Sequence, residues 1–193
     1  MSGYDTEKIQ SLIGGHMDRP MVAVETGILL GDTTRKMSGM FRHVISIDIA
    51  TGIVEAATTA LADLKNVELI LGDSAQVVPE LAKSIHEPVL WYLDAHWFPG
   101  ANISRENPFP LWDELDAIAA RTYPDIVMVD DVHAFGRDDW GCDHPAGVVE
   151  RWGELSEEAI VTRLGRVVKS LIAMDKVVCY LDDLPQPHNH IRE

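Results

Sequence analysis

The chain has 193 residues, of which 46% are hydrophobic, so it is long enough for one sizeable α/β domain with a packed core. Its formal net charge of −15 argues against a nucleic-acid partner, because an acidic surface repels phosphate backbones. No apolar run approaches the ~20 residues that span a bilayer, and residues 1–20 lack the basic-then-apolar pattern of a signal peptide. We therefore expect a cytoplasmic protein with no membrane partner.

Short runs of β-branched and apolar residues alternate with longer stretches of helical periodicity, which indicates an α/β fold with a mainly parallel sheet and helices on both faces. The apolar run before Asp94 is nearly unbroken, which is typical of a central strand buried on both faces. The strands predicted for this sheet are Met21–Glu25, His43–Asp48, Val67–Leu71, Val89–Leu93 and Ile126–Val129.

Helices are predicted between these strands from apolar residues at helical spacing and polar residues at the helix starts. Thr51 is the expected N-cap of the helix after the second strand. Two polar loops, Phe98–Pro110 and Phe135–Pro145, precede the last two helices. The other predicted helices are Asp32–Met40, Ala75–Ser84, Leu111–Arg121 and Ala146–Leu155.

The end of the chain differs from the rest. Two apolar runs, Arg166–Met174 and Lys176–Leu181, meet around Asp175, which predicts an antiparallel strand pair. We expect residues 1–193 to form a single domain, with a short N-terminal segment at 1–20 and a frayed tail at 185–193.

Polar residues and glycines follow the first three predicted strands, at the edge where open α/β sheets bind ligands. The first strand leads into Glu25-Thr26-Gly27-Ile28-Leu29-Leu30-Gly31, whose glycines let the backbone turn sharply and approach a ligand. Asp48, at the end of the second strand, is placed to accept both hydroxyls of a ribose. After the third strand, Asp73 is placed to accept a hydrogen bond from an adenine amino group.

Each of these features also has a purely structural explanation. Many α/β proteins have a glycine turn, Asp48 is able to cap a strand end, and Asp73 is able to cap the next helix. Their occurrence at three successive strand ends favours a ligand. The Gly-x-x-x-Gly spacing differs from the Gly-x-Gly-x-x-Gly of nicotinamide and flavin sites, so a nicotinamide dehydrogenase is disfavoured.

Over roughly Val22–Leu181, the chain resembles class I S-adenosylmethionine-dependent methyltransferases, on the motifs at 24–31, 45–48 and 71–74. The resemblance implies a Rossmann-like methyltransferase fold with a C-terminal antiparallel strand pair, and S-adenosylmethionine (SAM) as cofactor. It places the amino-acid part of SAM at Gly27 and its neighbours, the ribose at Asp48 and the adenine beside Asp73. The positions predicted to bind the cofactor are Glu25, Thr26, Gly27, Gly31, Asp48, Asp73, Ser74 and Asp94.

The fourth and fifth predicted strands end in a second group of acidic residues. The stretches at 93–97 and 129–133 place Asp94, Asp130 and Asp131 at one rim. Adjacent carboxylates repel one another, so ionised together they need a cation or hydrogen-bond donors. A magnesium or calcium ion with oxygen ligands is the simplest metal for this set.

Two histidines flank the acidic rim. His96, two residues beyond Asp94, is the candidate general base, because imidazole exchanges protons near neutral pH. A structural role for His96, in orienting Asp94 or capping a turn, also remains open, and the same holds for His133. Together His96, His133 and one carboxylate form an alternative site for iron or zinc.

The acidic rim resembles the cation-dependent O-methyltransferases, including the catechol type and certain antibiotic-sugar and macrolide enzymes. The resemblance implies a divalent cation on Asp94, Asp130 and Asp131 that binds the oxygens of a small-molecule acceptor. The metal lowers the pKa of the acceptor hydroxyl and fixes its angle for in-line displacement, with Asp94 and His96 as the catalytic residues. The sequence has Asp131 where the catechol type has Asn, and it shows no clear counterpart of that type's lysine base.

Trp97 and Phe98 are expected to line the acceptor pocket, with aromatic core packing as the competing interpretation. Because residues 1–20 are short for a helical cap over an acceptor, a homodimer in which the partner closes the pocket is a further hypothesis. Two other functions remain open. One is a SAM-binding protein without methyl transfer. The other is a metal-dependent hydrolase that activates water at the acidic rim. That function gives Glu25, Asp48 and Asp73 no joint role.

Overall fold

The computed structural model describes residues 5–14, 22–96, 109–137 and 151–182. The strands in these ranges are β1 (Val22–Thr26), β2 (His43–Asp48), β3 (Val67–Leu71), β4 (Val89–Leu93), β5 (Ile126–Val129), β6 (Val167–Ala173) and β7 (Lys176–Leu181). The bounds of β2 to β5 and of β7 are those predicted from the sequence, while β1 and β6 differ by one residue at their ends.

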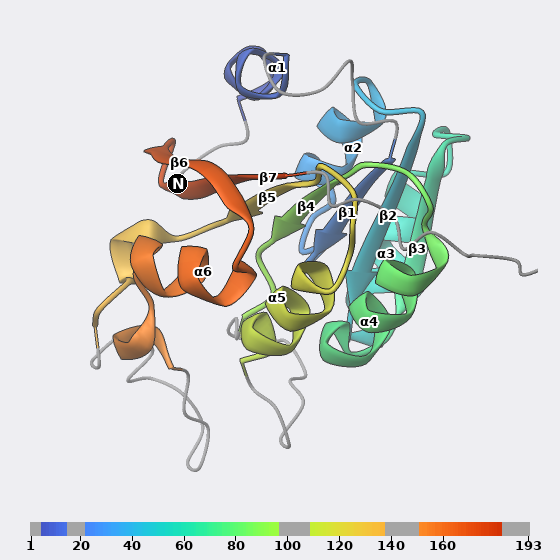
Figure 1. The fold of residues 1–193 in the computed structure, drawn as a ribbon. Coiled ribbons are helices and arrows are strands. Elements are labelled where there is room, and N and C mark those ends of the chain that lie inside the picture. Colours follow the sequence, from blue (N-terminus) through green and yellow to red (C-terminus); the bar gives the residue numbers. More distant parts are fainter. Residues whose placement is uncertain (1–4, 15–21, 97–108, 138–150, 183–193) are drawn as a thin grey trace, which may run out of the picture.

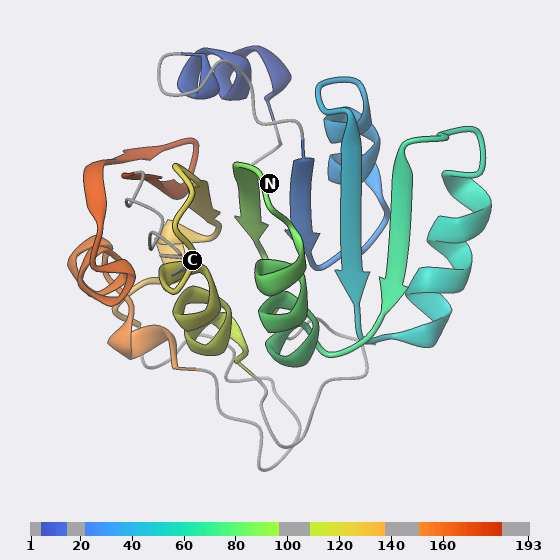
Figure 2. The same cartoon turned by 45° about the vertical axis from the view of Figure 1, so that its right-hand side comes forward.

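All seven strands form one sheet in the order β3-β2-β1-β4-β5-β7-β6. β1 to β5 pair in parallel, whereas β7 is antiparallel to both β5 and β6. The arrowheads of β1 to β4 point to the same edge in Figure 2. This arrangement confirms the mainly parallel sheet with a C-terminal antiparallel strand pair.

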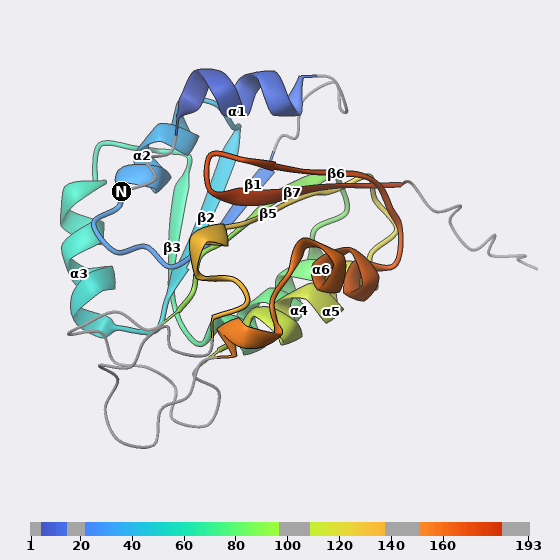
Figure 3. The same ribbon diagram turned by 90° about the vertical axis from the view of Figure 1, so that its left-hand side faces the viewer.

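Helices cover both faces of the sheet, as predicted. The described helices are α1 (Thr6–Ile13), α2 (Asp32–Ser38), α3 (Thr51–Ala60), α4 (Ser74–Ser84), α5 (Leu111–Ala119) and α6 (Glu157–Leu164), with short 3-10 turns η1 (Val132–Ala134) and η2 (Trp152–Glu154). Figure 1 shows α4, α5 and α6 together on one side of the sheet, and Figure 3 shows α1, α2 and α3 across the sheet from them.

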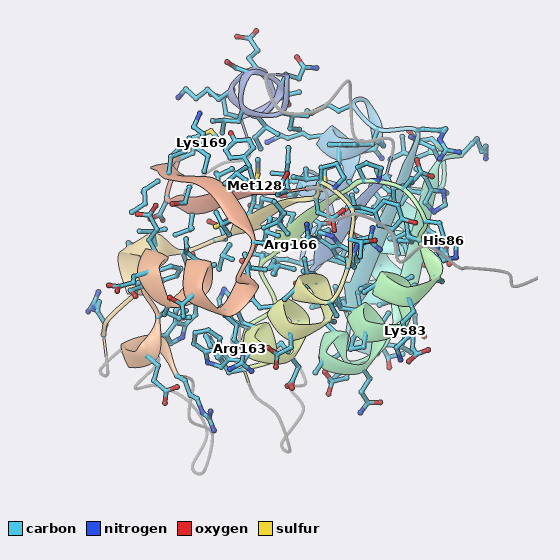
Figure 4. The ribbon with its side chains drawn as sticks, in the orientation of Figure 1. Lys83, His86, Met128, Arg163, Arg166 and Lys169 are labelled. Carbon is cyan, nitrogen blue, oxygen red and sulfur yellow. The ribbon has the colours of Figure 1, made fainter. Side chains whose placement is uncertain are left out.

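Each face has its own hydrophobic core. The α4–α6 side packs on strand residues such as Val24, Trp91 and Val129, while the α1–α2 side packs on the alternating positions, including Met128, labelled in Figure 4. Strand side chains alternate between the faces, so β4, flanked by parallel neighbours, is fully buried. Among the described residues, no helix has the length and apolar character needed to cross a bilayer.

Two helices were not predicted from the sequence. α1 begins after Asp5, whose side chain accepts a hydrogen bond from the Lys8 amide, and it buries Ile9. α6 begins after Ser156, which accepts from the Ala159 amide at 3.0 Å, and it ends at Gly165 in the left-handed region. Both therefore carry the ordinary capping signals.

Two predictions about helix starts and positions were wrong. The N-cap of α3 is Ala50, because Thr51 is already the first helical residue. The helix predicted at Ala146–Leu155 is, in its described part, only the 3-10 turn Trp152–Glu154, because Leu155 is extended to bring Ser156 into its capping position. Residues 146–150, like the predicted tail at 185–193, lie outside the described residues.

Candidate active site

The carboxyl ends of the central strands are tied together by backbone hydrogen bonds beyond the regular sheet. The Asp94 amide donates to Thr26 O at 3.1 Å, and the Asp130 amide donates to Leu93 O at 3.1 Å. On the other side of β1, the Gly27 amide donates to Ile47 O at 2.9 Å. The residues that follow β1, β2, β4 and β5 therefore lie along one edge, as the topology of an open α/β sheet requires.

The glycine turn after β1 approaches the end of β4 closely. Gly27 has φ +88°, and a Cβ there would lie 2.6 Å from the Asp94 carbonyl oxygen. Gly31 has φ +76°, caps α2 and leaves only 3.1 Å between a hypothetical Cβ and the Leu61 side chain. Both positions require glycine, because any side chain is strained at these angles and at Gly27 it also clashes with backbone.

Glu25 and Thr26 lie beneath this turn. Glu25 is 1% exposed and accepts hydrogen bonds from the hydroxyl of Thr34, at 2.5 Å, and from that of Ser46. Burial raises the pKa of Glu25 to about 7 despite those hydrogen bonds. The buried hydroxyl of Thr26 accepts from the Asp94 amide at 3.2 Å. These two side chains support the turn from inside the protein.

Asp48 and Asp73, by contrast, lie at the surface of the edge. Asp48 accepts from the Ile28 amide at 3.0 Å and from the Ala50 amide at 2.8 Å, which fixes its carboxylate beside the glycine turn. Each carboxylate oxygen is able to accept a second hydrogen bond. Asp73 caps α4 by accepting from the Ala75 amide at 3.0 Å, so its capping role is confirmed.

The acidic rim brings together Asp94, His96 and Asp131. His96 Nε2 is 3.0 Å from Asp131 Oδ2 and 3.7 Å from Asp94 Oδ1, and all three side chains are partly buried. Ligand atoms of these residues lie within 4.8 Å of one another, close enough to share one cation. A histidine thus stands in the set in place of the third carboxylate predicted from the sequence.

That third carboxylate, Asp130, is directed to a different group. Its Oδ1 accepts from Lys176 Nζ at 2.8 Å and from the Asp131 amide at 2.8 Å, while its Oδ2 accepts from the Tyr92 hydroxyl at 2.5 Å. Lys176 is fully buried. Among the described residues, Asp130 belongs to neither of the two groups with metal-ligand spacing. The structure therefore separates Asp130 from the other two predicted metal ligands.

The two carboxylates next to His96 have different electrostatic environments. Burial and the charge of Asp130 raise the pKa of Asp94 well above its ordinary value, against the opposing charge of His96. Burial also acts to raise the pKa of Asp131, but the hydrogen bond and charge of His96 outweigh it and lower that pKa. A cation among these residues would relieve the repulsion that Asp94 experiences.

His133 is on the outer side of the rim. Its Nδ1 is 2.6 Å from Asp175 Oδ2 and 3.8 Å from Asp131 Oδ1, and the His133 amide donates to Asp175 at 2.9 Å. These three residues form the second described group with metal-ligand spacing. His96 and His133 belong to different groups, which disfavours one iron or zinc site held by both.

A small cavity of about 20 Å³, with room for about one water-sized group, lies beside the rim and is partly open to solvent. Asp94, His96, Phe109, Glu114 and Trp152 are among the residues that line it. The Trp152 ring packs edge-on against His96, with centroids 5.5 Å apart, and against Phe109 at 5.2 Å. The predicted aromatic lining residues Trp97 and Phe98 lie outside the described residues.

Two buried residues of this region, Glu114 and Lys176, were not predicted from the sequence. Glu114 is on the apolar stripe of α5 formed by Leu111, Leu115 and Ile118, so a charged residue at an inward helical position was the available signal. Lys176 begins a strand and could be read as an exposed end residue. Nothing in the sequence indicates that it pairs with Asp130.

The sheet order, the antiparallel pair and the glycine turn after β1 define the Rossmann-like methyltransferase fold. Solved structures that share it include a SAM-dependent methyltransferase from Aquifex aeolicus, with a TM-score of 0.52 and 18% identity over 95% of this chain and 92% of that chain. A methyltransferase from Podospora anserina, solved with bound S-adenosylhomocysteine (SAH), gives a TM-score of 0.55 and 16% identity over 93% of this chain and 80% of that one.

An rRNA methylase from Streptococcus thermophilus has a TM-score of 0.51 and 15% identity, and the match covers 96% of this chain and 99% of that chain. No protein-family model matches the chain, and no curated protein sequence matches it significantly. At identities this low, the structural likeness shows the fold and leaves the ligand, the acceptor and the metal to be argued from the site.

Proposed function

We propose that this chain is a SAM-dependent methyltransferase that methylates a hydroxyl group of a small-molecule acceptor. The observation that carries the proposal is the single edge on which the glycine turn and Asp48 lie beside the Asp94–His96–Asp131 group. This arrangement supports a cofactor site next to a polar, partly buried reaction site on a methyltransferase fold.

The chemistry of the first part of this edge fits SAM. Asp48 presents carboxylate oxygens for the ribose hydroxyls, and Asp73 with Ser74 borders the position proposed for the adenine. The turn between Gly27 and Gly31 gives backbone access for the amino-acid part. When bound, SAM supplies a methyl group that is already activated by the sulfonium charge. The carboxylates of the edge suit that positive charge.

We also propose that Asp94, His96 and Asp131 hold a divalent cation. One imidazole and two carboxylates favour Mn²⁺, Fe²⁺ or Zn²⁺ over Mg²⁺, which prefers oxygen ligands. The cation would lower the pKa of the acceptor hydroxyl. Without it, His96 accepts the hydroxyl proton itself, oriented by Asp131 at 3.0 Å. A chelator distinguishes these two mechanisms. It abolishes turnover if a cation activates the hydroxyl, and it leaves turnover unchanged if His96 alone accepts the proton.

The charge of the chain supports a small-molecule acceptor. The sequence has 16 Lys and Arg residues against 31 Asp and Glu residues, a balance that opposes binding to an RNA backbone. The rRNA acceptor named for one structural neighbour is therefore not proposed here. A cytoplasmic location and a homodimer remain predictions, and solution scattering tests the second through the molecular mass.

Turnover assays test the proposal. Purified protein is incubated with methyl-labelled SAM and a panel of hydroxylated small molecules, and methylated products are detected by mass spectrometry. We expect both His96→Ala and Asp94→Ala to lose turnover, and His96→Ala to keep its affinity for SAH. His133→Ala, outside the Asp94–His96–Asp131 group, is the matched control and should keep turnover.

Other results have distinct meanings. SAM binding without turnover on any acceptor would favour a SAM-binding protein, and loss of SAH affinity in His96→Ala would show that this residue serves the cofactor rather than the acceptor. Hydrolysis of a test ester with no SAM binding would favour the metal-dependent hydrolase.

A further inference from the structure

Glu114 is a buried carboxyl group with an unused acceptor. It projects from α5, is 1% exposed, and its Oε1 has no hydrogen-bond partner in the part of the chain that the structure describes. The hydroxyls of Ser74 and Thr26 hydrogen-bond to the carboxyl group. An unpaired buried acceptor is costly and rare in native proteins, so Oε1 points to a donor that the described residues do not supply.

The same residue lines the cavity beside the acidic rim. The cavity also has apolar walls from Leu93, Leu111 and Val129, and aromatic ones from Phe109 and Trp152. Asp94 and His96 line it as well, so a molecule that places a small group in the cavity lies next to both Glu114 and the proposed reaction site.

We propose that Glu114 binds a protonated amine of the methyl acceptor, so that the acceptor is an amino alcohol with an apolar body. Only the identification of the bound amine as the methyl acceptor rests on the proposed function. The amine, a group small enough for the cavity, would donate to Glu114 Oε1, while the apolar body lies at the open side of the cavity and the hydroxyl faces the Asp94–His96 side.

Charge selects an ammonium group over other donors. Among the described residues, the ionisable ones that line the cavity besides His96 are the acids Asp94, Glu114 and Asp130, and Asp130 is paired with Lys176. An anionic acceptor would meet repulsion there. The rings of Phe109 and Trp152 also favour a cation, because aromatic faces attract positive charge. A hydrogen bond between ionised groups is about twice as strong as one between neutral groups.

Binding of two small probes tests the inference directly. Benzylamine and benzyl alcohol have the same apolar body, and they differ in the cationic group. Affinities are measured by calorimetry at about pH 8, above the pKa of about 7 that burial gives Glu114. We expect benzylamine to bind about tenfold more tightly than benzyl alcohol, and to shift the indole N–H resonance of Trp152.

Glu114→Gln keeps an oxygen that is able to accept from Ser74 and Thr26, and it removes the charge. We expect it to lose the preference for the amine while its urea midpoint and SAH affinity change little. Asp113→Asn, an exposed neighbour on α5, removes a charge outside the cavity and should keep the preference.

Equal affinity of the unmutated protein for the two probes would overturn the inference even if Glu114→Gln failed to fold. So would an amine preference that survives in Glu114→Gln, or a single ordered water as the only partner of Oε1 in a crystal soaked with benzylamine. SAH binding is measured in parallel, so its absence counts against the proposed methyltransferase and its presence isolates a failure of the amine site.

Discussion

Breaking the buried ion pair between Lys176 and Asp130 should strongly destabilise the folded protein at the carboxyl ends of the strands, where the candidate active site lies. Lys176 is fully buried, and its Nζ lies 2.8 Å from Asp130 Oδ1, 3.3 Å from Met174 O and 5.5 Å from the centre of the Tyr92 ring. Lys176→Met keeps most of the aliphatic volume and removes the ammonium group. Asp130, only 6% exposed, is then left as a buried carboxylate without its cation.

Removing one partner of a buried ion pair costs about 3–5 kcal/mol. Asp130 retains the Tyr92 hydroxyl at 2.5 Å and the Asp131 amide at 2.8 Å, so we expect the lower end of that range. At roughly 2–4 °C per kcal/mol for a chain of this length, about 3 kcal/mol lowers Tm by about 6–12 °C. Because Asp130 also holds the Asp131 amide, the affinity for the proposed divalent cation should fall as well.

Urea and thermal unfolding of four proteins measure this effect: the unmutated chain, Lys176→Met, Asp130→Asn and the double variant. Asp130→Asn removes the charge that Lys176→Met leaves uncompensated, so the double variant should recover at least about 1.5 kcal/mol relative to additivity. A loss below about 1 kcal/mol for Lys176→Met, or additive single effects, would show that the ammonium group of Lys176 does not stabilise the Asp130 carboxylate.

Three further predictions concern the glycine turn and its surroundings. Gly27→Ala should lower the free energy of unfolding in urea by at least about 2 kcal/mol and abolish SAH binding. The control Gly136→Ala, at φ +72° with no atom within 4 Å of the new Cβ, should lower it by only about 1 kcal/mol. Similar losses of unfolding free energy in the two variants would exclude the clash with Asp94 as the cause. The raised pKa of Glu25, about 7 against 4.5 unfolded, means that the folded state binds the extra proton, so this group stabilises fully below pH 4.5 and loses up to about 3 kcal/mol by pH 7. Glu25→Gln should therefore show a smaller fall in unfolding free energy across that interval than the unmutated chain, and an unchanged pH profile would contradict the shift. Asp48→Asn should weaken SAH binding about tenfold or more, because it replaces a carboxylate acceptor by an amide, and calorimetry showing equal affinity would remove Asp48 from the ribose site.

The strands were predictable because parallel strands buried on both faces leave a plain signal. The apolar runs at 89–93 and 126–129 have no amphipathic alternative, and polar residues end each one. α1 and α6 are eight residues long, and their capping signals at Asp5 and Ser156 were present but went unused. The prediction of a helix at Ala146–Leu155 ignored the capping signal at Ser156. In the structure, Ser156 starts the helix at this point of the chain.

The site was predictable as a location, but its internal contacts were not. Asp130 and Asp131 are neighbours in sequence, and only the left-handed backbone of Asp131, at φ +62°, turns its carboxylate to His96 while Asp130 faces inward to Lys176. Strand periodicity does not extend past the end of β5, so the sequence gives no means to separate the two. Glu114 is on α5, which is separated in sequence from the end of β4 by a long connection. Only the tertiary packing of that helix brings Glu114 to the rim.

Calorimetry of SAH binding to the unmutated protein is the decisive experiment, because the proposed methyltransferase requires a cofactor site at the glycine turn whatever its acceptor is. We expect one site per chain with a dissociation constant of the order of micromolar, weakened in Asp48→Asn and lost in Gly27→Ala. An absence of binding by both SAM and SAH in folded protein would contradict it.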